Sequence, residues 1–153
     1  MMNMKRVICL CLVMGLVLML SGCGIRRFEM YGMPRYESKE CYYDEEGFQD
    51  YADFCKYYYN ETTIKKFETH SKFKIVTESD IEVIRGYFED FELWAEEMYY
   101  YKNYDFDYLT QIKEGDYYYI YVDPNYNTFE YGYYDVYYVD MTKQILYFVH
   151  VNI

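Results

Sequence analysis

Hydrophobic and polar residues alternate along the C-terminal part of the chain with the period of β-strands. Tyrosine- and valine-rich runs cover 116–123, 133–140 and 144–151, separated by Pro124-Asn125 and by Met141-Thr142-Lys143. A connection as short as the second requires antiparallel neighbours. The last run is apolar on both faces, which is typical of a central strand. We therefore expect a β-meander here.

A helical period precedes this region. Apolar residues recur three and four positions apart, on one side of a predicted helix that ends near Met98: Ile81, Ile84, Phe88, Phe91 and Ala95. Ser79 and Glu82 have the spacing of a capping box at its start. The run 72–76 alternates and predicts a short strand, and 99–107 predicts a loop.

A second helical pattern lies nearer the N-terminus. Asp44 is a suitable cap, and apolar residues then recur at helical spacing: Phe48, Tyr51, Ala52, Cys55 and Tyr59. We expect a helix over 45–58, followed by a polar loop over 60–71 with a helical turn around 64–67. The predicted order is α-β-α-β-β-β. This is an α+β fold, with an antiparallel sheet of three to four strands and two helices on one face.

The first residues follow another pattern. Lys5 and Arg6 precede an unbroken apolar run, Val7–Leu20, which is shorter than the roughly 20 residues of a membrane-spanning helix. This is typical of a secretory leader. Leu20, Ser21, Gly22 and Cys23 then follow, and this segment resembles the lipobox of bacterial lipoproteins.

That resemblance implies cleavage before Cys23 and attachment of diacylglycerol to its thiol, which gives stable membrane anchoring. Residues 1–22 are then a removed signal peptide, 23–39 a lipidated cysteine with a flexible tether, and 40–153 one domain. We expect the protein on the extracytoplasmic face of a bacterial cell membrane. The tyrosine-rich part also resembles uncharacterised lipoproteins of low-GC Gram-positive bacteria, a resemblance that carries no function.

The net charge of the chain limits the classes of partner that it can bind. The chain has 153 residues, with 15 basic and 26 acidic side chains and a net charge of -11. Such an acidic chain does not bind nucleic acid by displacing counterions from phosphates. Apart from diacylglycerol on Cys23, we expect no cofactor.

Two cysteines, Cys41 and Cys55, remain in the predicted domain. Outside the cytoplasm they can form a disulfide, which would close a loop of about 15 residues and be worth about 3 kcal/mol. Two reduced, packed thiols are the alternative, and the sequence does not decide between them.

The chain has 25 tyrosines. One interpretation is a binding face, lined by side chains of two neighbouring strands: Tyr117, Tyr119, Tyr121, Tyr133 and Tyr137. Tyrosine buries a large area at low entropic cost. The alternative is that tyrosine is common because it suits strands with one buried and one exposed face. Alanine is scarce while isoleucine, lysine, asparagine and tyrosine are abundant, a composition that also indicates an AT-rich genome.

Catalytic signals are weak. His150 shares a strand face with Leu146 and Phe148, which favours a hydrogen-bonded core or edge histidine, and His70 lies in a predicted loop. We find no motif for hydrolysis, nucleotide binding or metal ligation. We assign no catalytic and no metal residues.

These observations predict a non-enzymatic, membrane-anchored accessory module that binds another envelope protein. A glycan- or cell-wall-binding module that uses the tyrosine-lined face is the first alternative. A small inhibitor or immunity protein with an acidic surface is the second, and an enzyme comes last.

Overall fold

The structure is a computed structural model, and it describes residues 32–43, 51–97, 99, 101–124 and 132–152. Contacts divide the chain into the units Met1–Met33 and Pro34–Ile153. The second unit is described below. The residues of the predicted cleavage and lipidation site, Leu20, Ser21, Gly22 and Cys23, lie outside the described residues.

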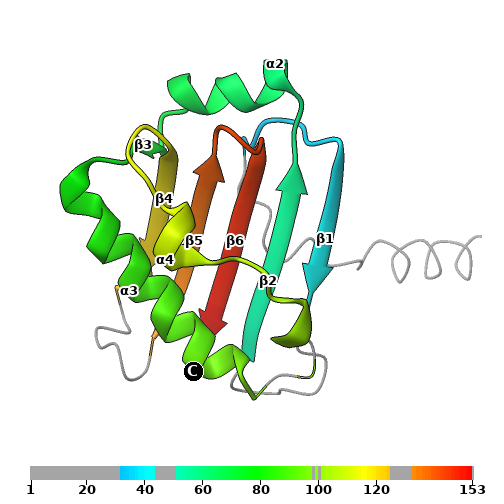
Figure 1. Ribbon diagram of the computed structural model, residues 1–153, viewed down its shortest axis with the longest axis vertical. Helices are drawn as coiled ribbons and strands as arrows, with labels where there is room; N and C mark the ends of the chain where they lie inside the picture. Colours follow the sequence, from blue (N-terminus) through cyan, green and yellow to red (C-terminus); the bar gives the residue numbers. More distant parts are fainter. Residues whose placement is uncertain (1–31, 44–50, 98, 100, 125–131, 153) are drawn as a thin grey trace, which may run out of the picture. The chain divides into compact units, whose positions relative to one another are not determined.

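The described chain forms one six-stranded sheet (Figure 1). Its strands are β1 (Ser38–Tyr42), β2 (Tyr51–Tyr58), β3 (Lys74–Ile75), β4 (Tyr117–Val122), β5 (Tyr133–Asp140) and β6 (Ile145–Asn152). They lie in the order β1-β2-β6-β5-β4-β3, and every neighbouring pair is antiparallel. The α+β class is confirmed, whereas the expected three to four strands and the element order were wrong.

The predicted meander is confirmed. β4 pairs with β5 and β5 with β6 in antiparallel register, and β6 also pairs with β2. β6 is therefore central, as its apolar character on both faces predicted. The β5–β6 turn is tight because Asp140 Oδ1 accepts hydrogen bonds from the Thr142 and Lys143 amides at 2.9 and 2.8 Å. Gln144 completes it with φ 61.

The helical elements are α2 (Glu61–Ile64), η1 (Lys65–Thr69), α3 (Glu78–Ala95), η2 (Tyr101–Asn103) and α4 (Tyr108–Gln111). The predicted capping box began at Ser79, two residues after the observed N-cap of α3, which is Thr77. The Thr77 amide donates to Asp80 Oδ2 at 2.9 Å. Among the residues that the structure describes, no helix is long and apolar enough to cross a membrane.

The predicted apolar face of α3 is confirmed. Ile84, Phe88, Phe91 and Ala95 are all 0% exposed and belong to one core cluster with residues of β2, β5 and β6. Figure 1 shows α3 and α4 in front of the same face of the sheet. This burial stabilises the fold, since each fully buried large side chain contributes about 1.5–3 kcal/mol.

The helix predicted over 45–58 was wrong where the structure describes it, because Tyr51–Tyr58 forms β2. Ala52 and Phe54 join the core under α3, while Cys55 and Tyr57 are buried on the opposite face. Because both of its faces are buried, the strand lacks the alternation of apolar and polar residues by which a strand with one exposed face is recognised. Pairing with β1 and β6 outweighs its helical spacing.

The expected tether also differs from the structure. The folded unit begins at Pro34, and β1 begins at Ser38. Before β1, the Glu37 amide donates to the Tyr58 carbonyl at 2.8 Å, and the Tyr36 ring lies 5.1 Å from that of Tyr57. The last part of the predicted tether is therefore attached to the sheet.

Candidate functional site

The sheet has a second face, opposite α3. On β5, Tyr134, Val136 and Tyr138 belong to the core cluster under α3, so the alternating residues point the other way. The β4–β5 register then places all five predicted tyrosines on that second face. We call Tyr117, Tyr119, Tyr121, Tyr133 and Tyr137 the tyrosine face.

The rings of the tyrosine face interact in pairs. Tyr119 is directly opposite Tyr137, with ring centroids 5.8 Å apart, and the Tyr121 ring lies 6.3 Å from that of Tyr133. Phe73 packs within 6.1 Å of Tyr119 and 6.3 Å of Tyr137. Such contacts stabilise the face by about 0.5–1.5 kcal/mol per pair beyond the area they bury.

The accessible part of this face is smaller than the sequence suggested. Tyr137 is only 3% exposed, whereas Tyr121 is 38% exposed. Tyr117, Tyr119 and Tyr133 are half-buried. Tyr137 therefore supports the other rings, and the surface that a partner can reach lies on the β4 side.

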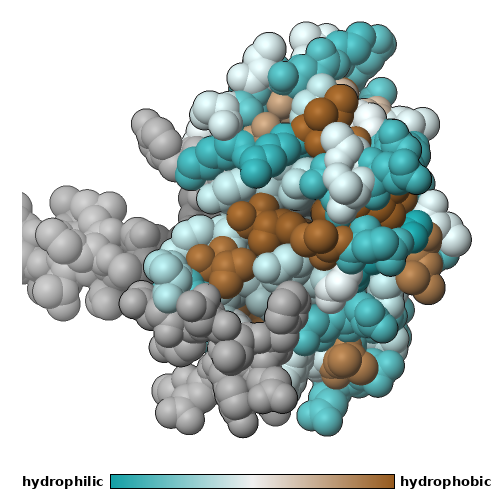
Figure 2. Space-filling view, turned by 90° about the vertical axis from the view of Figure 1, so that its left-hand side faces the viewer, coloured by the Kyte–Doolittle hydropathy of each residue, from teal (hydrophilic) through white to brown (hydrophobic). Residues whose placement is uncertain are grey.

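Exposed apolar side chains gather on that same side of the molecule. Figure 2 shows them in a band across the side on which β3 and β4 lie in Figure 1. The exposed aliphatic side chains of β3, of β4 and of the first half of α3 are Ile75 at 53%, Val122 at 40% and Val83 at 56%. A contiguous exposed apolar patch marks an interaction surface.

A basic side chain lies beside these rings. Lys72 Nζ is 5.6 Å from the Tyr119 ring centroid, a cation–π contact worth about 0.5–1 kcal/mol at an exposed site.

His150 lies on the same face as the five tyrosines but is fully buried. Its Nδ1 is 2.6 Å from Asp135 Oδ1, and its ring is 4.9 Å from that of Tyr133. The register aligns Asp53, His150 and Asp135 across β2, β6 and β5. The pair joins β5 to β6 inside the protein, so its position suits a structural role, as the sequence suggested.

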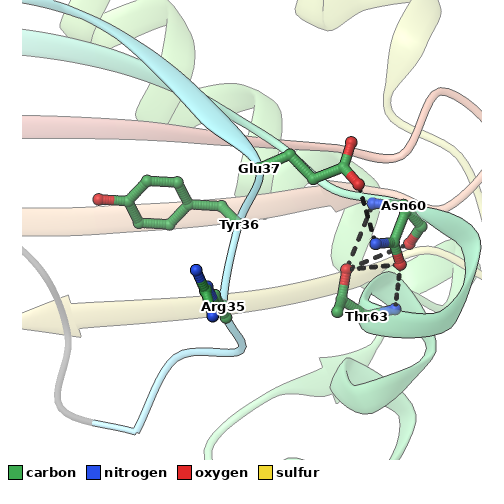
Figure 3. A pocket seen from close by; sticks show the side chains of 5 residues that line it. All are labelled: Arg35, Tyr36, Glu37, Asn60 and Thr63. Carbon is green, nitrogen blue, oxygen red and sulfur yellow. Dashed lines mark hydrogen bonds between the residues drawn. The ribbon is translucent and has the colours of Figure 1, made fainter.

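A pocket of about 360 Å³ lies between the start of β1 and the start of α2. Figure 3 shows Arg35 and Tyr36 on one side of it and Glu37, Asn60 and Thr63 on the other. Glu37 Oε1 accepts from Asn60 Nδ2 at 2.9 Å, and Asn60 Oδ1 accepts from the Thr63 amide at 2.9 Å. The pocket presents one aromatic ring together with a cation, a carboxylate, an amide and a hydroxyl.

Sequence reasoning missed this pocket. Arg35, Tyr36 and Glu37 fall in the predicted tether, and Asn60 and Thr63 fall in a predicted loop. The only local signal is the helix-capping Asn60, which accepts hydrogen bonds from two amides of α2.

Cys41 and Cys55 form a disulfide. They are direct partners in the β1–β2 register, with Cα atoms 4.1 Å apart. The covalent bond therefore fastens an edge strand to its neighbour. No group of three or more His, Cys, Asp or Glu side chains within the described ranges is arranged to hold a metal ion.

No protein-family model, no curated protein and no solved structure matches the chain.

Proposed function

We propose that this chain is a lipid-anchored bacterial protein on the extracytoplasmic face of the cell membrane, where it acts as a non-enzymatic module that binds another envelope protein. The anchor is supported by the leader pattern, with Lys5 and Arg6 before an apolar run and Leu20-Ser21-Gly22 before Cys23. Two acyl chains on one cysteine provide stable membrane attachment.

One observation carries the interaction part of the proposal. The accessible tyrosines of β4 lie on the side of the domain where exposed apolar residues gather. Tyrosine and aliphatic side chains together provide the buried centre of a typical protein interface. Tyrosine is also enriched among the residues that dominate binding energy.

The anchor is tested by changing Cys23→Ala in the full chain and fractionating cells that produce it. We expect the wild-type protein in the membrane fraction with a diacylglycerol mass on Cys23, and the variant without that mass. A variant that keeps the lipid mass would contradict the proposed anchor.

The interaction is tested by placing a photo-crosslinking amino acid at Tyr121 in the protein's own cells. The matched control position is Leu93, which is 64% exposed on α3. We expect one envelope protein to crosslink in stoichiometric amount from position 121 and not from position 93. Equal adducts from both positions, or none from 121, would show that this surface binds no specific protein.

Glycan binding is the second candidate, and the pocket favours it. Tyr36 offers a ring on which the C–H face of a sugar can pack, and Arg35 and Glu37 offer a donor and an acceptor for hydroxyl or carboxylate groups. Titration with soluble peptidoglycan fragments tests it. We expect Tyr36→Ala to weaken binding about tenfold, a loss of about 1.4 kcal/mol, while Tyr121→Ala leaves it unchanged. The absence of binding by the wild-type protein would exclude these fragments as ligands.

A further inference from the structure

One edge of the sheet is only half covered. β3 has two residues and pairs with β4 only at Tyr117 and Tyr118. Beyond Tyr118, no strand within the described ranges pairs with the outer side of β4.

The backbone groups on this free half point outward at alternate residues. The Asp123 amide donates to the Tyr133 carbonyl at 2.9 Å, so Asp123 is hydrogen-bonded to β5. In an antiparallel ladder the bonded positions alternate. Ile120 and Val122 therefore direct their N–H and C=O groups away from β5, toward the open edge.

Residues 119–122 of the free half carry neither of two features that commonly protect sheet edges. Tyr119, Ile120, Tyr121 and Val122 include no charged residue and no proline. Proteins normally block exposed edges with such residues or with a covering segment. An uncharged aromatic and β-branched edge is a template for another strand.

We propose that the free half of β4 accepts an extended segment of a partner protein, which adds to the sheet by backbone hydrogen bonds. The outward amides and carbonyls of Ile120 and Val122 would supply the backbone bonds. Side chains of the added strand would alternate between Tyr119 and Tyr121 on the tyrosine face and Ile120 on the α3 face. This deepens the proposed function by giving its binding mode.

Charge identifies the chemistry of the added segment. Asp123 follows the free edge directly, whereas the Asp135 carboxylate, opposite Tyr121 in the register, already contacts His150 Nδ1 at 2.6 Å. The whole chain carries a net charge of -11. A segment that alternates aliphatic and basic residues complements this surface, whereas a second copy of the chain brings the same negative charge.

A synthetic peptide of alternating valine and lysine tests the proposal with the full-length protein in mild detergent. Hydrogen exchange at the Ile120 amide is measured with and without the peptide. We expect saturating peptide to slow this exchange at least about tenfold, and a peptide of alternating valine and glutamate to leave it unchanged. Equal protection by both peptides would overturn the basic character assigned to the segment.

Two variants locate the effect. Val122→Pro removes an outward N–H that β5 does not use, and we expect it to weaken peptide binding about tenfold or more, whereas Val122→Thr keeps that N–H and binds normally. If Val122→Pro does not fold, Tyr121→Lys repels the basic peptide at the same edge, with Leu93→Lys as its control. Wild-type affinity in a folded Val122→Pro or in Tyr121→Lys would overturn the proposal.

Two further outcomes also decide against it. An Ile120 amide that exchanges equally fast with and without the basic peptide means that no strand is added. A protein that sediments as a dimer, with Ile120 already protected, means that a second copy occupies the edge. Because the peptide experiment needs neither the lipid nor the natural partner, its failure is distinguishable from failure of the anchor and crosslinking tests.

Discussion

The two edges of the sheet are built in opposite ways. The outer strand β1 carries the charged residues Lys39 and Glu40. The Cys41–Cys55 disulfide joins β1 to β2, and an ion pair of Glu40 with Lys56 adds a second link between these strands. Glu40 Oε2 lies 3.0 Å from Lys56 Nζ, whose side chain is only 9% exposed. The opposite edge ends in the two-residue β3 and leaves uncharged residues of β4 at the surface.

This difference indicates which edge of the sheet can accept an added strand. Charges on β1 make a further strand costly there. Lys56, the ion-pair partner of Glu40, also contacts Asp105 Oδ2 at 3.0 Å. Burial alone would lower the pKa of Lys56, but hydrogen bonds to Asp105 and Glu40 hold that pKa above its usual value. The ammonium group stays charged, and β1 stays fastened.

The largest effect is expected at the closed edge. Replacing Cys41 and Cys55 together by alanine should reduce the free energy of unfolding by about 3 kcal/mol, because the unfolded chain gains the freedom of an open loop. Urea unfolding followed by the fluorescence of the single Trp94 measures this. A loss below about 1 kcal/mol would show that β1 is held by its charges rather than by the disulfide.

The covered half of β4 depends on buried hydrogen bonds near it. The Tyr138 hydroxyl donates to the buried Asp116 carboxylate, which also accepts from the Met141 amide at 3.0 Å. Tyr138→Phe should cost about 2 kcal/mol, since it leaves a buried carboxylate oxygen without its donor. Tyr147→Phe is the control, because its hydroxyl makes only a 3.4 Å contact. Equal losses in the two variants would contradict the role of Asp116.

A smaller effect is expected where α3 meets β4. The Tyr118 hydroxyl donates to Asp80 Oδ1 at 2.8 Å, and burial together with Asp80 raises the pKa of Tyr118 to about 12. Tyr118→Phe should cost about 1 kcal/mol. Tyr121→Phe, with its exposed side chain, should cost nothing measurable in the same urea assay. A larger loss from Tyr121→Phe would mean that the free half of β4 is not open.

The smallest expected effect is a pH dependence. Burial raises the pKa of Asp116 above its ordinary value of 3.8, although the Tyr138 and Met141 hydrogen bonds oppose this. The folded state then binds the proton more tightly than the unfolded state, so Asp116 contributes stability as the pH falls through the raised pKa toward 3.8. Asp116→Asn should lack this contribution, so its stability relative to wild type should fall as the pH is lowered through that interval. An unchanged curve would contradict the raised pKa.

The sequence predicted the strands of the meander and the buried face of α3 because each has a clear period. Ile84, Phe88 and Phe91 face one side at helical spacing, and β5 was predicted with its observed bounds. β2 was misassigned because its apolar residues recur at helical spacing and, with both faces buried, show no strand alternation. β3 was predicted as a strand over 72–76, but it spans only Lys74–Ile75.

The candidate site was predicted only in part. Alternation along β4 and β5 correctly placed the five tyrosines on one face, since the period of a strand fixes the side of each residue. It did not show that Tyr137 is buried, where its ring packs against those of Phe148 and Phe73 from other segments. The pocket at Arg35 and Asn60 joins residues far apart in sequence, and no local pattern connects them.

The central place of β6 has a consequence for how the domain is made. β6 is the last strand in the sequence, yet it alone joins β2 to β5. While the chain is synthesised, β1 and β2 cannot pair with the β5–β4 half until residues 145–152 emerge. Because these pairings join segments far apart in the sequence, we expect folding to be comparatively slow.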